Sequence, residues 1–377
     1  MEHYNPIFSK VPTLRFPNYN GEWQKTVMGK VCSFRKGYGI AKDDLSSDGT
    51  PCILYGELYT TYKTAIAKTI KSKTSIQSKS LVYSQKDDVI IPCSGETAED
   101  IATSICVPYD GVLLGGDLTI VHSDLDGAFL SNQINSVRKY DIARIAQGKS
   151  IVHLQADELK KIFIFYPSIQ EQRKISAFID KIDERIEIQN KIISKYETLI
   201  KGLCDMIFRH NKSVSLSDLV KCKTSALQEN TVSTCHRGEY KVLGASGAIA
   251  AIDTYQFEES GILVLKDGSK AGKIQFAQGK YSVVGTSVVL IPNEACDARY
   301  LYFAMSSIDF EKYKVGSGIP HIYFKDYSNE RIYYPDKALR KKITKTLDFY
   351  ESMVEIERKM LSAMQKQKAF LLQSMFI

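Results

Sequence analysis

Lysines recur in the segment from Thr60 to Lys86, which contains no acidic residue. Serines and threonines surround them, and Tyr59, Tyr62 and Tyr83 are interleaved. Ammonium and hydroxyl groups are the donors that proteins use to contact phosphates. The segment therefore predicts a surface for binding a polyanion, and its candidate contacts are Lys63, Lys68, Lys71, Lys73 and Lys79.

A second basic segment runs from Lys266 to Lys280, where Asp267 is the only acidic residue. Its glycines would allow the backbone to come close to a ligand. For each segment alone, an ordinary solvated basic loop is the alternative, but one such segment in each half of the chain favours a binding role. The candidate contacts are Lys266, Lys270, Lys273 and Lys280.

Catalytic motifs are weak throughout the sequence. It lacks a phosphate-binding GxxxxGKS/T loop, a GxGxxG turn, a GxSxG elbow and an HExxH metal motif. Tyr4–Phe8 (YNPIF) only partly matches the NPPF/Y signature of adenine methyltransferases, and Glu158–Lys160 only partly matches a nuclease ExK. His153 and His321 sit in matching segments, where a structural or phosphate-contacting role is favoured over acid-base chemistry. We therefore predict a chain without catalysis, metal or cofactor of its own.

The composition of the chain limits which classes of protein remain possible. Lysine and arginine number 50 against 43 acidic residues, which gives a formal charge of +7 that is compatible with a polyanion partner without being diagnostic. The 8 cysteines are scattered singly, as expected for reduced thiols rather than for zinc ligands or disulfides. No stretch reaches the roughly 18 apolar residues of a membrane helix. We expect a cytoplasmic protein with no membrane partner.

The elements that position these residues occur twice. A shift of 168 residues places Gly148 on Gly316, and the same register holds to the end of the chain. Upstream, 87–95 (DDVIIPCSG) corresponds to 260–268 (SGILVLKDG) only with gaps. A retained scaffold with diverged surfaces suits a protein that presents two different binding surfaces.

Each repeat ends in an apolar heptad pattern of about 33 residues, which predicts a helix roughly 50 Å long. The apolar stripe must be covered, and the other copy is the nearest partner. We therefore predict that the two helices pair antiparallel, giving an approximate twofold axis. The predicted pairing residues are Ile175, Ile179, Ile182, Ile186, Ile193, Ile200 and Leu203 in the first copy, and Ile343, Leu347, Val354, Leu361 and Leu371 in the second.

Short apolar runs alternate with Gly, Ser and Asp turns before each helix, as in sheets with a few helices, among them 128–146 and 299–313. The predicted fold class is α+β, with two globular domains separated by two long antiparallel coiled-coil helices. The predicted boundaries are a first domain at 1–168, a first helix at 169–210, a second domain at 211–336 and a second helix at 337–377.

Several strings give the sequence a family resemblance. They are 12–23 (PTLRFPNYNGEW), 87–102 (DDVIIPCSGETAEDIA), 167–193 (PSIQEQRKISAFIDKIDERIEIQNKII), 241–255 (KVLGASGAIAAIDTY) and 267–274 (DGSKAGKI). Across essentially its whole length the chain resembles the specificity subunit of a type I restriction-modification system. The EQRKI segment is the most specific string, and its second copy, 336–343 (DKALRKKI), keeps the basic pair and Ile343.

The resemblance implies that the two globular domains are target recognition domains, each reading one part of a split double-stranded DNA sequence. It also implies that the helices act as a ruler and dock two methyltransferase subunits, which use S-adenosylmethionine to methylate adenine. A restriction and translocase subunit, which uses ATP and Mg²⁺, would join the complex. The chain itself would then be a non-catalytic subunit that reads an asymmetric bipartite target.

Two alternatives remain open. The chain could be the targeting region of a single-chain restriction-methylation enzyme, which would require an active-site motif that the sequence does not show. It could also be a coiled-coil scaffold that binds only proteins, in which case the lysine-rich loops would have no role in binding DNA.

Overall fold

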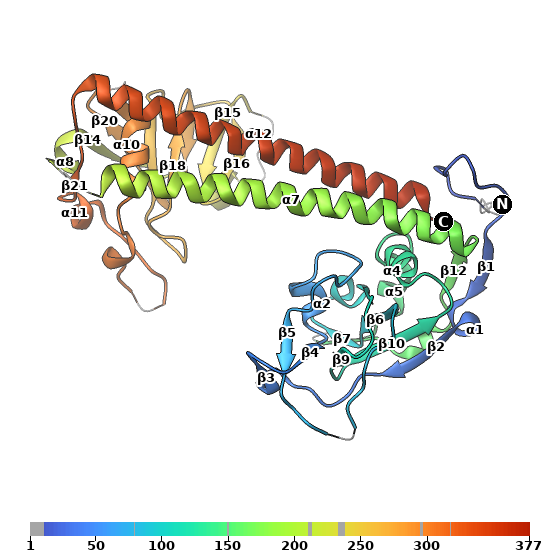
Figure 1. Cartoon of the computed structure of the whole chain (residues 1–377). Coiled ribbons are helices and arrows are strands. Elements are labelled where there is room, and N and C mark those ends of the chain that lie inside the picture. The colour runs from blue at the N-terminus through green and yellow to red at the C-terminus, as the bar shows by residue number, and fades with distance from the viewer. Residues whose placement is uncertain are drawn as a thin grey trace. The chain divides into compact units, whose positions relative to one another are not determined.

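The structure is a computed structural model that describes residues 11–78, 80–148, 151–209, 213–232, 238–294, 297–316 and 318–377. Its contacts divide the chain into two compact units. Unit 1 comprises Met1–Asn190 with Met360–Ile377, and unit 2 comprises Lys191–Lys359. Each unit therefore contains one globular domain and a part of each long helix (Figure 1).

The central sheet of the first domain has four strands, and every neighbouring pair is antiparallel. In spatial order they are β2 (Cys32–Lys36), β10 (Leu118–Ser123), β6 (Asp88–Pro92) and β8 (Ile105–Val107). Strand β6 is buried along its whole length. Its residues after Asp88 form an apolar run, which is typical of a strand covered on both faces, and helix α4 (Gly127–Asn135) packs against it.

A smaller sheet carries the first basic segment. Its strands, in order, are β3 (Leu45–Ser46), β5 (Ser72–Thr74), β4 (Thr50–Ile53) and β9 (Leu113–Leu114). The other short elements of this domain are η1 (Lys42–Asp44), α2 (Glu57–Thr60), β7 (Ser94–Gly95), α3 (Ala98–Ile101), α5 (Lys139–Ile145), β11 (Val152–His153) and α6 (Ala156–Leu159).

The second domain repeats the central sheet with the same strand order and the same antiparallel pairing. Its strands are β14 (Val220–Thr224), β20 (Ser287–Pro292), β17 (Gly261–Leu265) and β18 (Ile274–Ala277). Helix α10 (Ala298–Met305) packs on this sheet as α4 does on the first. A different accessory sheet accompanies it, formed by β16 (Gly247–Ile252), β15 (Tyr240–Gly244) and β19 (Tyr281–Val283).

The ends of each domain also match. In the first, β1 (Gln24–Val27) pairs antiparallel with β12 (Phe163–Tyr166), the strand that leads into the long helix. In the second, β13 (Val214–Ser215) pairs in the same way with β21 (Arg331–Ile332). The connecting short helices are α1 (Met28–Val31), α8 (Leu216–Leu219), α9 (Glu229–Val232), η3 (Glu311–Tyr313) and α11 (Phe324–Tyr327).

One loop is reproduced at the exact spacing of the repeat. Gln147 and His153 exchange two backbone hydrogen bonds, and Val315 and His321 do the same 168 positions later. Each loop contains a glycine with positive φ, Gly148 at 135° in the first. A Cβ there would lie 2.0 Å from the carbonyl oxygen of Ile151, so only glycine fits. The predicted internal repeat is therefore confirmed.

The two long helices are α7 (Ile169–Phe208, 40 residues) and α12 (Lys337–Met375, 39 residues). Each spans about 60 Å at 1.5 Å per residue, more than the heptad pattern alone, because each helix begins six residues before that pattern. They run side by side, with α7 in green and α12 in red (Figure 1). In unit 1 the start of α7 shares a buried cluster with the end of α12, and in unit 2 the end of α7 shares one with the start of α12. The predicted antiparallel arrangement is confirmed.

None of the predicted pairing residues is exposed. Those that are buried are Ile175, Ile179, Ile193, Ile343, Leu347, Val354 and Leu371. Those that are partly buried are Ile182, Ile186, Ile200, Leu203 and Leu361. The stripe is not entirely apolar, because Lys368 Nζ of α12 lies 2.5 Å from Asp183 Oδ1 of α7.

Two of the shorter helices differ from prediction. The expected helix at 128–146 is two helices, α4 and α5, interrupted at Ser136, whose hydroxyl donates to the carbonyl of Asn132. The expected helix at 299–313 ends at Met305, where the hydroxyl of Ser306 donates to the carbonyl of Phe303. Serine hydroxyls compete in this way with backbone N–H groups for the helix carbonyls. The spacing of apolar residues does not reveal such competition.

Candidate nucleic-acid interface

The first basic loop is anchored by a buried tyrosine while its lysines face outward. The hydroxyl of Tyr62 accepts the backbone N–H of Lys71 at 3.3 Å, and burial raises the pKa of Tyr62 to about 12. Ser72 and Thr74 on β5 point toward the domain, where Ser72 donates to Glu57 Oε1 at 2.5 Å. Because side chains alternate along a strand, Lys71 and Lys73 share the opposite, exposed face.

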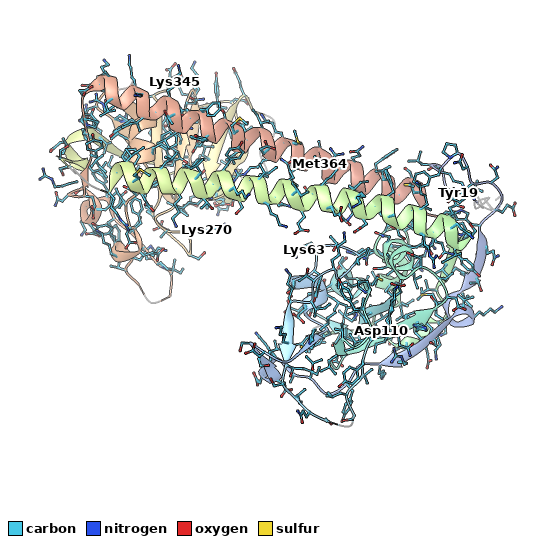
Figure 2. All side chains as sticks on the ribbon, viewed as in Figure 1. Tyr19, Lys63, Asp110, Lys270, Lys345 and Met364 are labelled. Carbon is cyan, nitrogen blue, oxygen red and sulfur yellow. The ribbon has the colours of Figure 1, made fainter. Side chains whose placement is uncertain are left out.

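Lys63 is also exposed and lies just beyond α2, where its Nζ is 3.5 Å from the carbonyl oxygen of Tyr59 (labelled in Figure 2). No carboxylate pairs with Lys63, Lys71 or Lys73 within the described part of the chain. These three ammonium groups can therefore meet an anion without breaking an existing ion pair. Lys79, the remaining candidate of this loop, lies outside the described residues.

Lys68 has a different environment from its neighbours. Its Nζ lies 2.5 Å from Asp180 Oδ1 and 2.8 Å from Glu184 Oε1, both on α7. Burial lowers the pKa of Lys68, but its hydrogen bonds to the two carboxylates outweigh that effect and raise the pKa above its usual value. Because two carboxylates already neutralise its charge, Lys68 is less available to a phosphate than Lys63, Lys71 and Lys73, and in the structure it joins the domain to α7.

The second basic loop includes β18 and two turns built on glycine. Gly268 and Gly272 have φ of 94° and 89°, and a Cβ on Gly272 would lie 2.6 Å from the Cβ of Phe310. Lys270 is exposed on the first turn (labelled in Figure 2). With Lys273 it lines a groove of about 530 Å³, which is also lined by Asp309, Glu311 and Lys314. The groove is thus basic on the loop side.

The other lysines of this loop have partners. Lys280 Nζ lies 4.7 Å from the ring centroid of Tyr255 and 3.9 Å from Glu258 Oε1, and the interaction with Tyr255 is the larger cause of its raised pKa. Lys266 Nζ lies 3.9 Å from Asp267 Oδ2. Lys273 Nζ donates only to a carbonyl oxygen, that of Ala245 at 3.4 Å. Lys270 and Lys273 are therefore the better-placed phosphate donors here.

Sequence reasoning missed a polar cluster on the central sheet of the first domain. The buried carboxylate of Asp88 accepts from Arg35 Nη2 at 2.6 Å and lies 2.8 Å from His122 Nδ1. Arg35 and His122 come from the adjacent strands β2 and β10 and are each more than a third exposed. Arg35 Nη1 also donates to the carbonyl oxygen of Tyr83 at 3.3 Å, so both terminal nitrogens of the guanidinium already have partners within the domain. The partners of Asp88 are distant in sequence, so no local motif marks them.

The matching histidines differ between the domains. His321 Nδ1 lies 2.8 Å from Asp267 Oδ1, beside the second basic loop. His153 occupies the same loop position but pairs through its backbone with Ser94. The two domains therefore share a backbone frame while carrying different chemistry at the same place.

Within the described ranges, no group of three or more His, Cys, Asp or Glu residues is placed to hold a metal ion. Burial raises the pKa of both Cys32 and Cys52 to about 11, which keeps these thiols protonated. Cys235, Cys296 and the YNPIF segment lie outside the described residues, and Glu158 pairs with Lys161 on the surface. No helix among the described residues is both long enough and apolar enough to cross a bilayer.

The fold is that of a protein with two related domains, and comparison with known proteins identifies its class. Residues 20–198 and 209–365 match the family described as the type I restriction modification DNA specificity domain. The chain therefore belongs to the family of type I restriction-modification specificity subunits.

Individual relatives agree with this assignment. A type I restriction enzyme MjaVIII specificity subunit from Methanocaldococcus jannaschii is 28% identical over 122 residues, which cover 31% of this chain and 28% of that protein. The match thus spans less than a third of the relative's length. The S subunit of a type I system from M. genitalium has the same fold, with a TM-score of 0.65 at 16% identity over 97% of this chain and 99% of that one. A second structure, whose title concerns complex assembly and conformational transition of the type I system, matches with a TM-score of 0.55 at 15% identity. The match covers 93% of this chain and 96% of that one.

Proposed function

We propose that this chain is the DNA-reading, non-catalytic subunit of a type I restriction-modification complex. The observation that carries the proposal is the duplicated central sheet, with equal strand order in both domains, beside accessory sheets and loops that differ. A constant frame with two different surfaces is suited to two unlike half-sites, so the target should be bipartite and asymmetric.

The helices supply the spacing between half-sites in this proposal. Both α7 and α12 run through both units as continuous helices. A length of about 60 Å, set against ~3.4 Å of duplex per base pair, gives an upper bound of about 18 base pairs on the interval. Any tilt of the helices relative to the DNA would shorten it.

Two identical exposed patches support the docking of two copies of one partner. Glu187, Ile188 and Lys191 on α7 recur at the repeat spacing as Glu355, Ile356 and Lys359 on α12. Ile188 is 55% exposed and Ile356 is 51% exposed, although isoleucine has no reason to recur on a solvated surface. The proposed partners are two adenine methyltransferase subunits, with a restriction and translocase subunit joining through the complex. S-adenosylmethionine, ATP and Mg²⁺ would bind to those partners.

The proposed phosphate contacts are Lys63, Lys71, Lys73, Lys270 and Lys273, with Lys79 retained as a sequence prediction and Lys266 and Lys280 in supporting positions. Replacing both Lys71 and Lys73 by glutamine should weaken DNA binding by the assembled complex on all sequences. The slope of log affinity against log salt concentration should fall by about 2, since each lost phosphate contact removes about one.

This prediction is checked by titrating duplex DNA into the complex at several salt concentrations. The matched control replaces Lys341 and Lys345 on α12 by glutamine. Both lysines are exposed, and their replacement removes the same amount of charge (Lys345 is labelled in Figure 2). If the double loop variant kept the affinity and salt slope of the unaltered chain, this loop would have no role in binding DNA. The alternative of a coiled-coil scaffold that binds only proteins would then be favoured.

A further inference from the structure

Each globular domain contacts its own long helix through a cation held between two carboxylates. In unit 1 the cation is Lys68, whose Nζ lies 2.5 Å from Asp180 and 2.8 Å from Glu184. Lys68 comes from the loop after α2, and both carboxylates lie on α7. Hydrogen bonds from Lys181 and then Lys68 lower the pKa of Glu184 to about 2, so the pair is fully charged at neutral pH.

In unit 2 the cation is Arg299, near the start of α10. Its Nε lies 2.5 Å from Asp348 Oδ1, and its Nη2 donates to Glu351; both carboxylates lie on α12. The guanidinium also lies over the ring of Phe276, 4.8 Å from the centroid. The stack and the two carboxylates together define one orientation of Arg299.

The helix positions of the two clamps are equivalent, whereas the cations are not. Asp180 and Asp348 are separated by the repeat spacing, and each lies eleven residues beyond the first residue of its helix. Lys68 and Arg299 come from unrelated parts of their domains, a loop in one and a helix in the other. Two differently built domains thus reach the same carboxylate of the repeated helix.

The clamp lies at the far end of the contact between each domain and its helix. A buried cluster already joins the two, through Ile175 and Ile179 in unit 1 and through Ile343 and Leu347 in unit 2. The clamp carboxylate lies eleven residues from the start of the helix, about 16 Å along its axis. Apolar packing is non-directional, whereas an ion pair at the edge of the contact favours one orientation of the domain.

The clamps contribute little to folding itself. The side chain of Lys68 is 43% exposed and that of Arg299 is 24% exposed. Ion pairs of this kind have small effects on global stability. Disrupting a clamp should therefore leave the domain folded and change only how it is held.

We propose that Lys68 and Arg299 are positioning residues that set the orientation of each recognition domain on the helix pair, and through it the interval between half-sites that the complex accepts. This inference rests on the function proposed above. Neither residue needs to touch DNA for its replacement to change which targets are bound.

The test uses the complete complex with its methyltransferase subunits and a set of duplexes. The duplexes carry the mapped target with its natural interval, or with the interval changed by one or two base pairs, and a further duplex carries a single half-site. Lys68→Glu places a third carboxylate beside Asp180 and Glu184. The preference for the natural interval should then fall on the order of fivefold, while affinity for the single half-site stays unchanged.

A second substitution should restore the preference. In Lys68→Glu with Asp180→Lys, the new lysine lies between two carboxylates again, so interval selectivity should return. The matched control is Lys71→Glu, which makes the same charge change in the same loop without an ion pair to break. It should weaken binding to every duplex and leave the interval preference unchanged. The corresponding pair in unit 2 is Arg299→Glu with Asp348→Lys.

The outcomes separate the two proposals. If the unaltered complex binds the natural target but Lys68→Glu behaves like Lys71→Glu, or the charge swap restores nothing, the positioning role is wrong and the proposed function stands. If the unaltered complex shows no sequence-specific binding, the proposed function is wrong and the positioning role falls with it.

Discussion

Replacing Arg340 with alanine is expected to destabilise the second domain by about 3–5 kcal/mol, because it would leave the buried carboxylate of Asp297 without its counter-charge and with the hydroxyl of Tyr334 as a remaining donor. Arg340 and Asp297 are 8% and 5% exposed, and the guanidinium donates to both carboxylate oxygens at 3.0 Å. It also donates to the carbonyl of Pro335 at 2.6 Å and lies 4.0 Å from the ring centroid of Tyr334. Urea denaturation followed by circular dichroism measures the loss.

The equivalent residue of the first repeat suggests a second variant of Arg340. Gln172 is the counterpart of Arg340, and its Nε2 donates to the carbonyl of Pro167 just as Arg340 donates to that of Pro335. Arg340→Gln should therefore keep this helix-start contact and lose less stability than Arg340→Ala. Lys341→Ala, an exposed neighbour, should change stability by no more than about 0.5 kcal/mol. A loss for Arg340→Ala as small as that of the control would contradict the assigned role of the ion pair.

Replacing Leu347 with alanine is expected to cost about 2–5 kcal/mol, the usual cost of emptying a fully buried leucine site. Leu347 is 0% exposed and belongs to a cluster that joins α12, the end of α7 and the core of the second domain. The cavity would thus loosen the helix pair and the domain together. Thermal unfolding followed at 222 nm measures the change.

Phe349 provides the control for that substitution, since it lies two residues further along the same helix and is 58% exposed. Phe349→Ala removes a larger side chain, yet it should change the free energy of unfolding by less than about 0.5 kcal/mol. Equal losses for the two variants would show that α12 does not bury the predicted face.

The sequence predicted the helices well because their signal is local and long. An apolar residue every three or four positions indicates which face of a helix is covered, and a repeat in the same chain supplies the partner. The direction of pairing rested on the expected twofold symmetry. The clusters that join Ile175 to Leu371 in unit 1 and Phe208 to Ile343 in unit 2 confirm it.

The candidate site was harder to predict because its contacts join distant parts of the chain. Lys68 resembles its neighbouring lysines in sequence, and only folding places it beside Asp180. Arg35 and Asp88 lie on different strands with no motif between them. Arg340 lies within the second copy of the EQRKI string, and its partner is a carboxylate 43 positions upstream, that of Asp297. Such pairs depend on tertiary structure, so no periodic pattern in the sequence predicts them.

In the proposed complex this chain alone chooses the DNA target, while companion subunits carry out the reaction. Adenine methylation mapping of cells that have the partner methyltransferase, with and without this chain, tests this division most directly. We expect one motif with two unequal halves and a fixed interval, which disappears when the chain is removed. A methylation map that is identical with and without the chain would contradict it.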